Sequence, residues 1–241
     1  MDTDQSLQCV VNLVQAERGK PDVLLLTGDI ADHGSAGAYN RMRDYSLQLT
    51  DRCYWLPGNH DDRQLMEAVL AATTCLSREV RIGNWQIVLL DSQVPGRVGG
   101  KLGAEQLSLL ETALEQASRQ QLHTLVCLHH HPVPIGSAWL DEQIVADAEA
   151  FLAIVDAYPG VKGILWGHIH QQVDEYRHTV ALMGSPSTCV QFAPGSDSFK
   201  ADATSPGYRW LELGEDGSMA SGVSRVQGVK FTVELDAQGY L

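Results

Sequence analysis

The chain has 241 residues, 44% of them hydrophobic and 20% charged, so it can bury a full core and is not a disordered or low-complexity protein. Its 30 acidic residues against 17 basic ones give a net charge of -13 at pH 7. Such a surface repels a phosphate backbone, which argues against nucleic acid as a partner. An anionic substrate would need bound cations to offset this field.

The cysteines and the apolar runs bear on the compartment. The five cysteines lie at least 22 residues apart and include no C-x-x-C pair, a pattern that favours reduced thiols over a disulfide framework or a zinc knuckle. No apolar run approaches the roughly 18 residues that span a bilayer, and the N-terminus lacks the order of a signal peptide. We therefore expect a soluble cytoplasmic protein without membrane contact.

Helices and strands alternate over the first two thirds of the chain. Apolar residues at the spacing of one helical face predict a helix over 4–18, which Gly19 would end. The apolar run 23–27 is typical of a strand buried on both faces. Further helices are predicted over 35–49, 63–72, 104–119 and 142–157, and further strands over 53–56, 80–82, 86–90, 124–128 and 161–166.

Strand patterns dominate after Gly167, where strands are predicted over 172–176, 179–183, 208–213 and 231–235, with a long loop over 194–206. The alternation upstream predicts an α/β fold. We expect a single domain over 1–241. Its 208–241 segment would be a C-terminal β extension or cap, which could cover a cleft or pair with a second subunit in a homodimer.

Four predicted strands end in polar motifs, at 28–29, 58–61, 129–132 and 167–170. Each motif alone has a simpler explanation, such as a helix cap, a turn or a surface patch. In open α/β sheets, however, ligands gather beyond the carboxyl ends of the strands. Four separate coincidences would be needed otherwise, so we favour one shared site.

The residue types in these motifs indicate a metal centre. Asp and Asn oxygens mixed with imidazoles suit manganese, iron or zinc in a five- or six-coordinate site better than a tetrahedral structural zinc. One carboxylate shared by several imidazoles suggests a bridged pair of ions. Two such ions can clamp the attacking and leaving oxygens of an in-line phosphoryl displacement, and they would offset the negative field.

The motifs Gly-Asp, Gly-Asn-His-Asp, His-His-Pro and Gly-His-Ile-His, in this order, resemble those of the calcineurin-like metallophosphoesterases over nearly the whole chain. The resemblance is closer to the bacterial 3',5'-cyclic AMP phosphodiesterases (class III cyclic nucleotide phosphodiesterases) at 55–61, 89–93, 128–132 and 185–192. It implies a four-layer α/β/β/α sandwich that hydrolyses 3',5'-cyclic AMP to 5'-AMP. The implied cofactors are two divalent ions, Fe²⁺ or Mn²⁺ with Zn²⁺ as an alternative, and the implied partner is a small anionic nucleotide.

The resemblance also implies roles for individual residues. Asp29 would bridge both ions and act in catalysis, Asn59, His130 and His168 would complete one metal site, and His170 would belong to the other. 

His130 is chosen because the family ligand usually lies two residues before the proline, with His129 and His131 as alternatives. His60 is similar to the histidine that assists the leaving group, which suits a side chain that titrates near neutral pH. Asn59, His60 and His170 are the residues expected to contact the substrate.

One family feature is absent from the sequence. The family begins with a strand that ends in Asp-x-His, whereas here only 28 residues precede Asp29, and they start with a helix pattern. We therefore expect a fold without its usual first strand, and a second metal site that has only Asp29 and His170 and is weak. Either Met1 is an internal methionine, which we favour, or the chain is a natural short form with impaired chemistry.

Two other functions are kept as alternatives. The same ligands could serve another phosphodiester or a phosphomonoester, because they report the reaction and not the organic group. Trp139, Phe192 and Tyr208 could stack on a base, although ordinary packing also explains them. Alternatively, a truncated chain could bind metal, and a nucleotide or a partner protein, without turnover.

Overall fold

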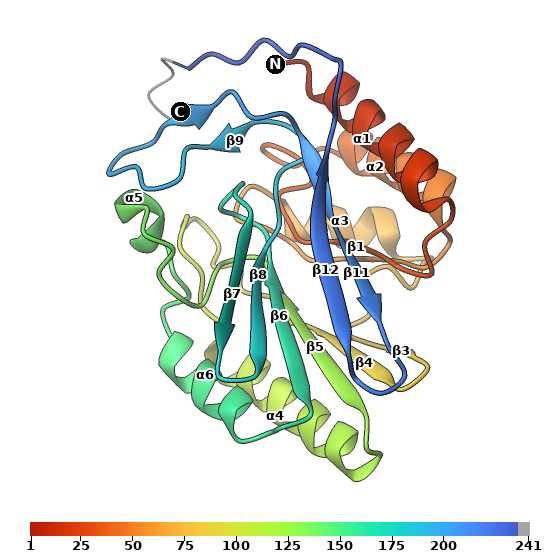
Figure 1. Cartoon of the computed structure of the whole chain (residues 1–241), viewed down its shortest axis with the longest axis vertical. Coiled ribbons are helices and arrows are strands. Elements are labelled where there is room, and N and C mark those ends of the chain that lie inside the picture. Colours follow the sequence, from red (N-terminus) through yellow and green to blue (C-terminus); the bar gives the residue numbers. More distant parts are fainter. Residues whose placement is uncertain (236–241) are drawn as a thin grey trace.

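Six strands form the central sheet of the computed structural model, which describes residues 1–235 (Figure 1). Its order is β3-β4-β5-β6-β8-β7, and β4, β5, β6 and β8 run parallel. Parallel strands share one carboxyl edge, so the loops after β4, β5 and β6 emerge together. The strands are β3 (Glu79–Ile82), β4 (Trp85–Leu89), β5 (His123–Leu128), β6 (Val161–Trp166), β7 (Val173–Arg177) and β8 (Val180–Gly184).

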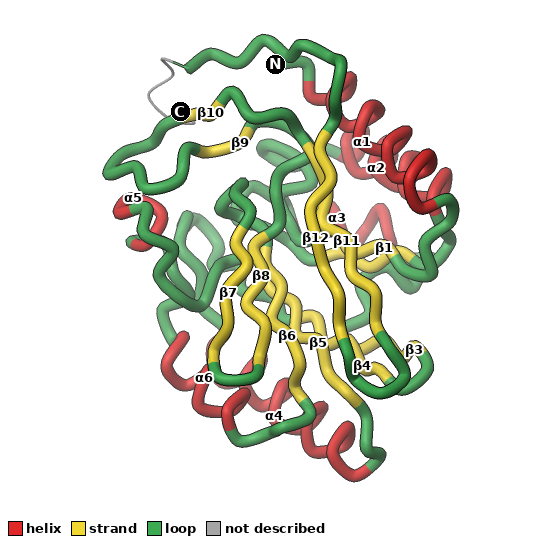
Figure 2. The backbone as a smooth tube through the Cα atoms, viewed as in Figure 1, coloured by secondary structure: helices red, strands yellow, loops and turns green. Residues whose placement is uncertain are grey.

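Two strand pairs make a second layer over this sheet. The parallel pair is β1 (Leu24–Leu26) with β2 (Cys53–Trp55), and the hairpin is β11 (Gly207–Leu213) with β12 (Met219–Arg225). One hydrophobic cluster joins side chains from β2, β4, β5, β6, β8 and the hairpin, so the core between the layers is continuous. Figure 2 shows the hairpin lying across the larger sheet.

Helices cover the two outer faces. The helices α4 (Gly103–Arg119) and α6 (Ala148–Asp156) pack on the larger sheet. On the other side, α2 (Ala36–Leu49) and α3 (Arg63–Leu70) pack on β1 and β2, with α1 (Thr3–Arg18) beside them. This arrangement confirms the predicted four-layer α/β/β/α sandwich (Figure 1).

Helix boundaries follow from capping residues. The carboxylate of Asp2 accepts from the Gln5 amide and begins α1, and Gly19 ends it with a left-handed φ of 63°. Ser35 caps α2 in the same way. Among the described residues α1 is the first element and β1 follows it.

The predicted helix over 142–157 is wrong in its first half, because two shorter helices, α5 (Ala138–Asp141) and α6, lie on either side of a turn. Tertiary hydrogen bonds replace the helical ones there: the Val145 amide donates to the His131 carbonyl, and the Ala146 amide donates to the Gly100 carbonyl. An amphipathic pattern cannot reveal such long-range bonds.

The C-terminal strands also differ from expectation. The segment 231–235 is not a strand, and the second hairpin strand is β12, whose small residues give a weak strand signal. A turn containing Gly217, with φ of 84°, pairs β12 with β11 and outweighs that propensity. The predicted loop 194–206 contains β10 (Ala201–Asp202), which pairs with β9 (Gln191–Phe192). Residues 236–241 of the predicted extension lie outside the described residues.

Candidate metal centre

Side chains from four separate loops meet beside the carboxyl ends of β1, β2, β5 and β6. The Nε2 atom of His129 lies 3.2 Å from Oδ2 of Asp29 and 3.2 Å from Oδ1 of Asn59. The same atom lies 3.2 Å from Nδ1 of His168. Three of the predicted ligands, Asp29, Asn59 and His168, are therefore brought together around His129.

Backbone features explain the glycines in the motifs. A Cβ atom on Gly28 would collide with the His129 ring, and one on Gly58 would collide with the Asp29 carboxylate. Asp29 and His168 have left-handed φ angles of 54° and 58°, which are uncommon outside glycine and occur often at functional sites. The Gly-Asp and Gly-Asn pairs thus allow the two loops to approach each other closely.

Hydrogen bonds to carbonyl groups fix the proton positions on two imidazoles. Nδ1 of His129 lies 2.6 Å from the Thr27 carbonyl oxygen, which can only accept, so this nitrogen carries a proton. Nε2 of His168 lies 2.8 Å from Oε1 of Gln143 and is protonated for the same reason. In their neutral forms, both histidines then point a lone pair from the other nitrogen into the centre.

Four atoms with lone pairs therefore converge: Oδ2 of Asp29, Oδ1 of Asn59, Nε2 of His129 and Nδ1 of His168. No proton lies between them unless the His129 ring is charged. Burial opposes ionisation of both partners, but the Asp29 charge raises the pKa of His129, and His129 together with the His60 amide lowers the pKa of Asp29. The pKa of His168 falls well below its ordinary value because of burial and the neighbouring His129. The arrangement therefore suits a positive charge at its centre, and the donor types fit a divalent transition metal.

His130 contacts protein groups outside this centre on both sides of its ring, unlike His129, the alternative at the same motif. Its Nε2 atom lies 2.8 Å from the Val98 carbonyl and its Nδ1 atom lies 2.8 Å from the Ser92 hydroxyl, so both nitrogens have protein partners. The ring remains near those of His129 and His168, within the same group of potential ligands. The nitrogens of His130 thus contact Val98 and Ser92, whereas Nε2 of His129 faces Asp29 and Asn59. Proline spacing alone did not distinguish them.

His170 lies on the same loop as His168 but not in the group around His129. Its Nδ1 atom lies 2.8 Å from the Val190 carbonyl, so the lone pair is on Nε2. Its ring stacks on Phe192 at 4.2 Å between centroids, with 9° between the planes. Burial lowers the pKa of His170 to about 4, so the ring is neutral and able to bind a metal at pH 7.

His60 has a partner that the sequence did not identify. Its Nδ1 atom lies 3.1 Å from Oδ1 of Asp32, and its backbone amide donates to Asp29 at 3.0 Å. The carboxylate can only accept, so Nδ1 carries a proton. Asp32 and His60 also form, with the exposed His33, a second group of potential metal ligands.

Asp61 holds together the loop that carries Asp29 and the loop that carries Asn59. Its buried carboxylate accepts from the amides of Gly58, Ile30 and Ala31 and from the Tyr39 hydroxyl. Burial is the main cause that raises its pKa. The motif contained this aspartate, but no feature of the sequence separated this structural role from metal binding.

The three aromatic residues considered for base stacking are not together. Trp139 and Phe192 are neighbours, with centroids 5.2 Å apart in an edge-to-face arrangement, but Phe192 is only 5% exposed. Tyr208 packs with α1, and its hydroxyl donates to Glu17 at 2.8 Å. Of the three, Phe192 stacks on His170.

Comparison with known proteins identifies the family. Residues 2–172 match the model of the calcineurin-like phosphoesterase family, which covers well over half of the chain. The chain belongs to this family. Members use a dinuclear metal site, and the group around His129 offers residues that could hold metal.

Full-length relatives carry a more specific name. The 3',5'-cyclic adenosine monophosphate phosphodiesterase CpdA of Pseudomonas aeruginosa is 45% identical over 240 residues, covering 100% of this chain and 88% of that protein. The CpdA protein of Escherichia coli K12 is 38% identical over 242 residues, covering 100% and 87%.

Solved structures show the same fold at low identity. A dimetal phosphatase from Danio rerio superposes with a TM-score of 0.61 at 15% identity, covering 93% of this chain and 89% of that structure.

Within residues 1–235 the helices are too short or too polar to span a bilayer.

Proposed function

We propose that this member of the calcineurin-like phosphoesterase family is a metal-dependent phosphodiesterase that hydrolyses 3',5'-cyclic AMP to 5'-AMP. The observation that carries the proposal is the convergence of Asp29, Asn59 and His168 on Nε2 of His129, each at 3.2 Å. The names of the relatives at 38–45% identity support this substrate.

Asp29, Asn59, His129 and His168 would hold one divalent ion, with His129 in the role predicted for His130. Asp29 and His170 would contribute to a second, weaker site. The donor set suits Fe²⁺ or Mn²⁺, with Zn²⁺ as an alternative. A bound ion supplies Lewis-acid polarisation of the phosphoryl group and lowers the pKa of water.

The chain's own residues orient these ligands and move one proton. The Thr27 carbonyl and Gln143 fix the tautomers of His129 and His168. Asp32 holds the proton on Nδ1 of His60. When the ring also carries a second proton, on the opposite nitrogen Nε2, it would give that proton to the sugar 3' oxygen as the P–O bond breaks, and the ring would return to its neutral form with the proton on Nδ1.

A matched pair of variants tests the proposal. His168 and His178 both have left-handed backbones, with φ of 58° and 54°, and glycine suits that conformation. With Mn²⁺ added, we expect His168→Gly to lose cyclic AMP turnover and His178→Gly to retain it. Turnover of bis(p-nitrophenyl) phosphate without turnover of cyclic AMP would favour another phosphodiester as the substrate.

A second candidate function is metal binding without turnover. The supporting observation is the sparse second site, for which the described residues offer Asp29 and His170. Metal counting separates the two functions: about one tightly bound ion per chain and no hydrolysis would support it, and two ions would contradict it.

A further inference from the structure

The segment Asp91–Gln93 follows β4 and reaches the loop that carries Asn59 and His60. The amide nitrogen Nε2 of Gln93 lies 2.7 Å from the Gly58 carbonyl oxygen and 2.6 Å from the Asp61 carbonyl oxygen. Gly58 and Asp61 immediately flank Asn59 and His60. One side-chain amide therefore holds both ends of this four-residue turn.

Gln93 is itself anchored. Its backbone amide donates to Oδ1 of Asp91 at 2.9 Å. Asp91 is 4% exposed, and its other oxygen lies 2.9 Å from Nη1 of Arg63 and 3.6 Å from Nη2 of Arg78. These ion pairs hold the buried carboxylate from which the Gln93 backbone is anchored, although Oδ2 accepts no hydrogen bond of regular geometry among the described residues.

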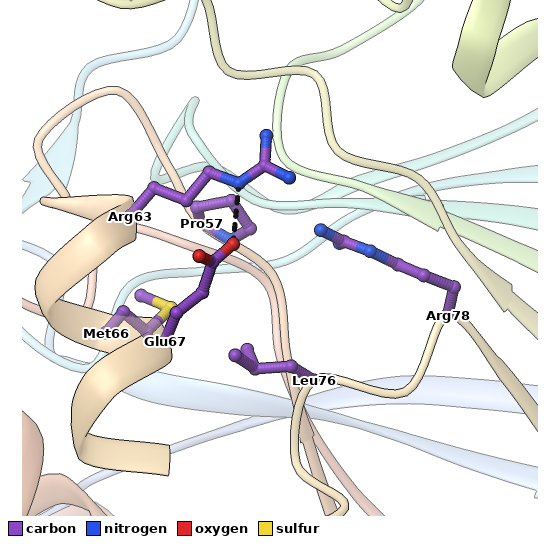
Figure 3. A pocket seen from close by; sticks show the side chains of 6 residues that line it. All are labelled: Pro57, Arg63, Met66, Glu67, Leu76 and Arg78. Atoms are coloured by element: carbon purple, nitrogen blue, oxygen red, sulfur yellow. Dashed lines mark hydrogen bonds and ion pairs between the residues drawn. The ribbon is translucent and has the colours of Figure 1, made fainter. Parts of the chain in front are cut away.

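Both arginines line one small cavity (Figure 3). Pro57, which precedes Gly58, forms part of its wall, and Arg63 is the first residue of α3 after the turn. Nη1 of Arg78 is buried without a hydrogen-bond partner among the described residues. The anchor of Gln93 is thus packed against the same short segment that Gln93 holds.

The turn is held from two directions. The Asp61 carboxylate accepts the Gly58 amide, and Gln93 donates to the carbonyls on either side of Asn59 and His60. Because the Asp61 bonds remain when Gln93 is replaced, we expect such a variant to fold. The variant should lose the hydrogen bonds that keep Asn59 and His60 in their orientation.

We propose that Gln93 is a positioning residue for Asn59 and His60. The roles of those two residues rest on the function proposed above, but their positions do not. A metal ligand or proton donor displaced by about 1 Å loses much of its effect, so two well-placed hydrogen bonds matter more for function than for stability.

The test uses Gln93→Met in the full chain, which keeps the length of the side chain and removes both donors. The control is Gln8→Met, because Gln8 bonds to Asn12 on the same helix, α1. In the metal-free protein, we expect amide hydrogen exchange at 58–61 to rise about tenfold in Gln93→Met. Calorimetric titration should show Mn²⁺ binding weakened about 10–100-fold in this variant and unchanged in the control.

Exchange and Mn²⁺ affinity equal to those of Gln8→Met would overturn the proposal. Neither readout requires cyclic AMP hydrolysis, so failure of the proposed function leaves this test intact. If Gln93→Met does not fold, Gln93→Asn, whose amide is too short to reach both carbonyls, gives the same comparison.

In a chain that hydrolyses cyclic AMP, comparison of two substrates distinguishes a positioning role of Gln93 from general damage to the site. Displacement of His60 should slow cyclic AMP, whose leaving group needs a proton, more than bis(p-nitrophenyl) phosphate, whose leaving group does not. A merely structural role would lower both rates by the same factor.

Discussion

Nε2 of His129 and Oδ2 of Asp29 lie 3.2 Å apart, and the proton that would join them occupies the place suited to a metal ion. The other ring nitrogen already donates to the Thr27 carbonyl, so Nε2 is protonated only when the ring is charged. A divalent ion must displace that proton. Metal binding and protonation of this pair therefore compete.

Comparison of His129→Ala with His130→Ala tests which imidazole binds metal. We expect His129→Ala to weaken Mn²⁺ binding more than about 100-fold, because it removes a direct ligand. His130→Ala should retain affinity within about tenfold but lower the free energy of unfolding by about 2 kcal/mol, since Ser92 and the Val98 carbonyl lose their partner. Titration calorimetry and urea unfolding measure the two effects, and the reverse order of affinities would restore His130 as the ligand.

Much of the fold followed from local sequence features. The alternation of helices and strands and the end of the first helix at Gly19 are short-range signals, and the structure agrees with them. The break between α5 and α6 and the strand β12 depend on bonds between distant segments, such as that from the Val145 amide to the His131 carbonyl. Periodicity contains no information about such bonds.

The metal centre was predictable to a similar degree. The motifs predicted that Asp29, Asn59 and His168 lie together, because they follow strands whose carboxyl ends meet, and the structure places all three beside His129. They did not distinguish His129 from His130, which depends on the direction in which each side chain leaves the strand. Two of the orienting groups are the carbonyls of Thr27 and Val190, which no residue type reveals.

Gln143 should control the tautomer of His168. Gln143→Leu removes the acceptor for the Nε2 proton, so Nδ1 no longer presents its lone pair in every molecule. We expect Mn²⁺ affinity to fall about 10-fold or more. Gln143→Glu keeps an acceptor and should restore the affinity. Equal affinities in all three proteins would show that His168 is oriented by packing alone.

His131 should make the metal-free protein sensitive to acid. Burial lowers its pKa to about 4, against about 6.5 in an unfolded chain, although Asp141, whose Oδ1 atom lies 3.8 Å from Nε2, opposes that shift. As the pH falls below about 6.5, the His131 ring takes up a proton in the unfolded state but not in the folded state. The free energy of unfolding therefore decreases until the pH reaches about 4.

Replacing His131 with Phe removes this contribution, which amounts to about 2 kcal/mol between pH 7 and pH 5. Urea unfolding with a chelator present should show a smaller loss for His131→Phe than for the unsubstituted chain over that interval. At pH 7 the variant should be at least as stable, because burying a phenyl ring does not require the desolvation of two ring nitrogens. An unchanged pH dependence would mean that His131 is already charged or exposed.

Arg209 on β11 should fasten the hairpin to the larger sheet. Its side chain is 1% exposed and donates to the carbonyls of Val173 and Gly184, to the Ser221 hydroxyl and to Asp174. Arg209→Met keeps the apolar stem and leaves both carbonyls without these donors. We expect it to lower the free energy of unfolding by about 3–5 kcal/mol.

Asp174→Asn is the matched control for Arg209→Met. Asp174 is 47% exposed, so loss of its charge should cost less than about 1 kcal/mol. A lower urea midpoint with an unchanged slope in Arg209→Met would show that the hairpin unfolds together with the sheet, because the slope follows the surface exposed on unfolding. Equal midpoints for the two variants would instead assign the docking of the hairpin to its apolar contacts, through Leu211 and Leu213.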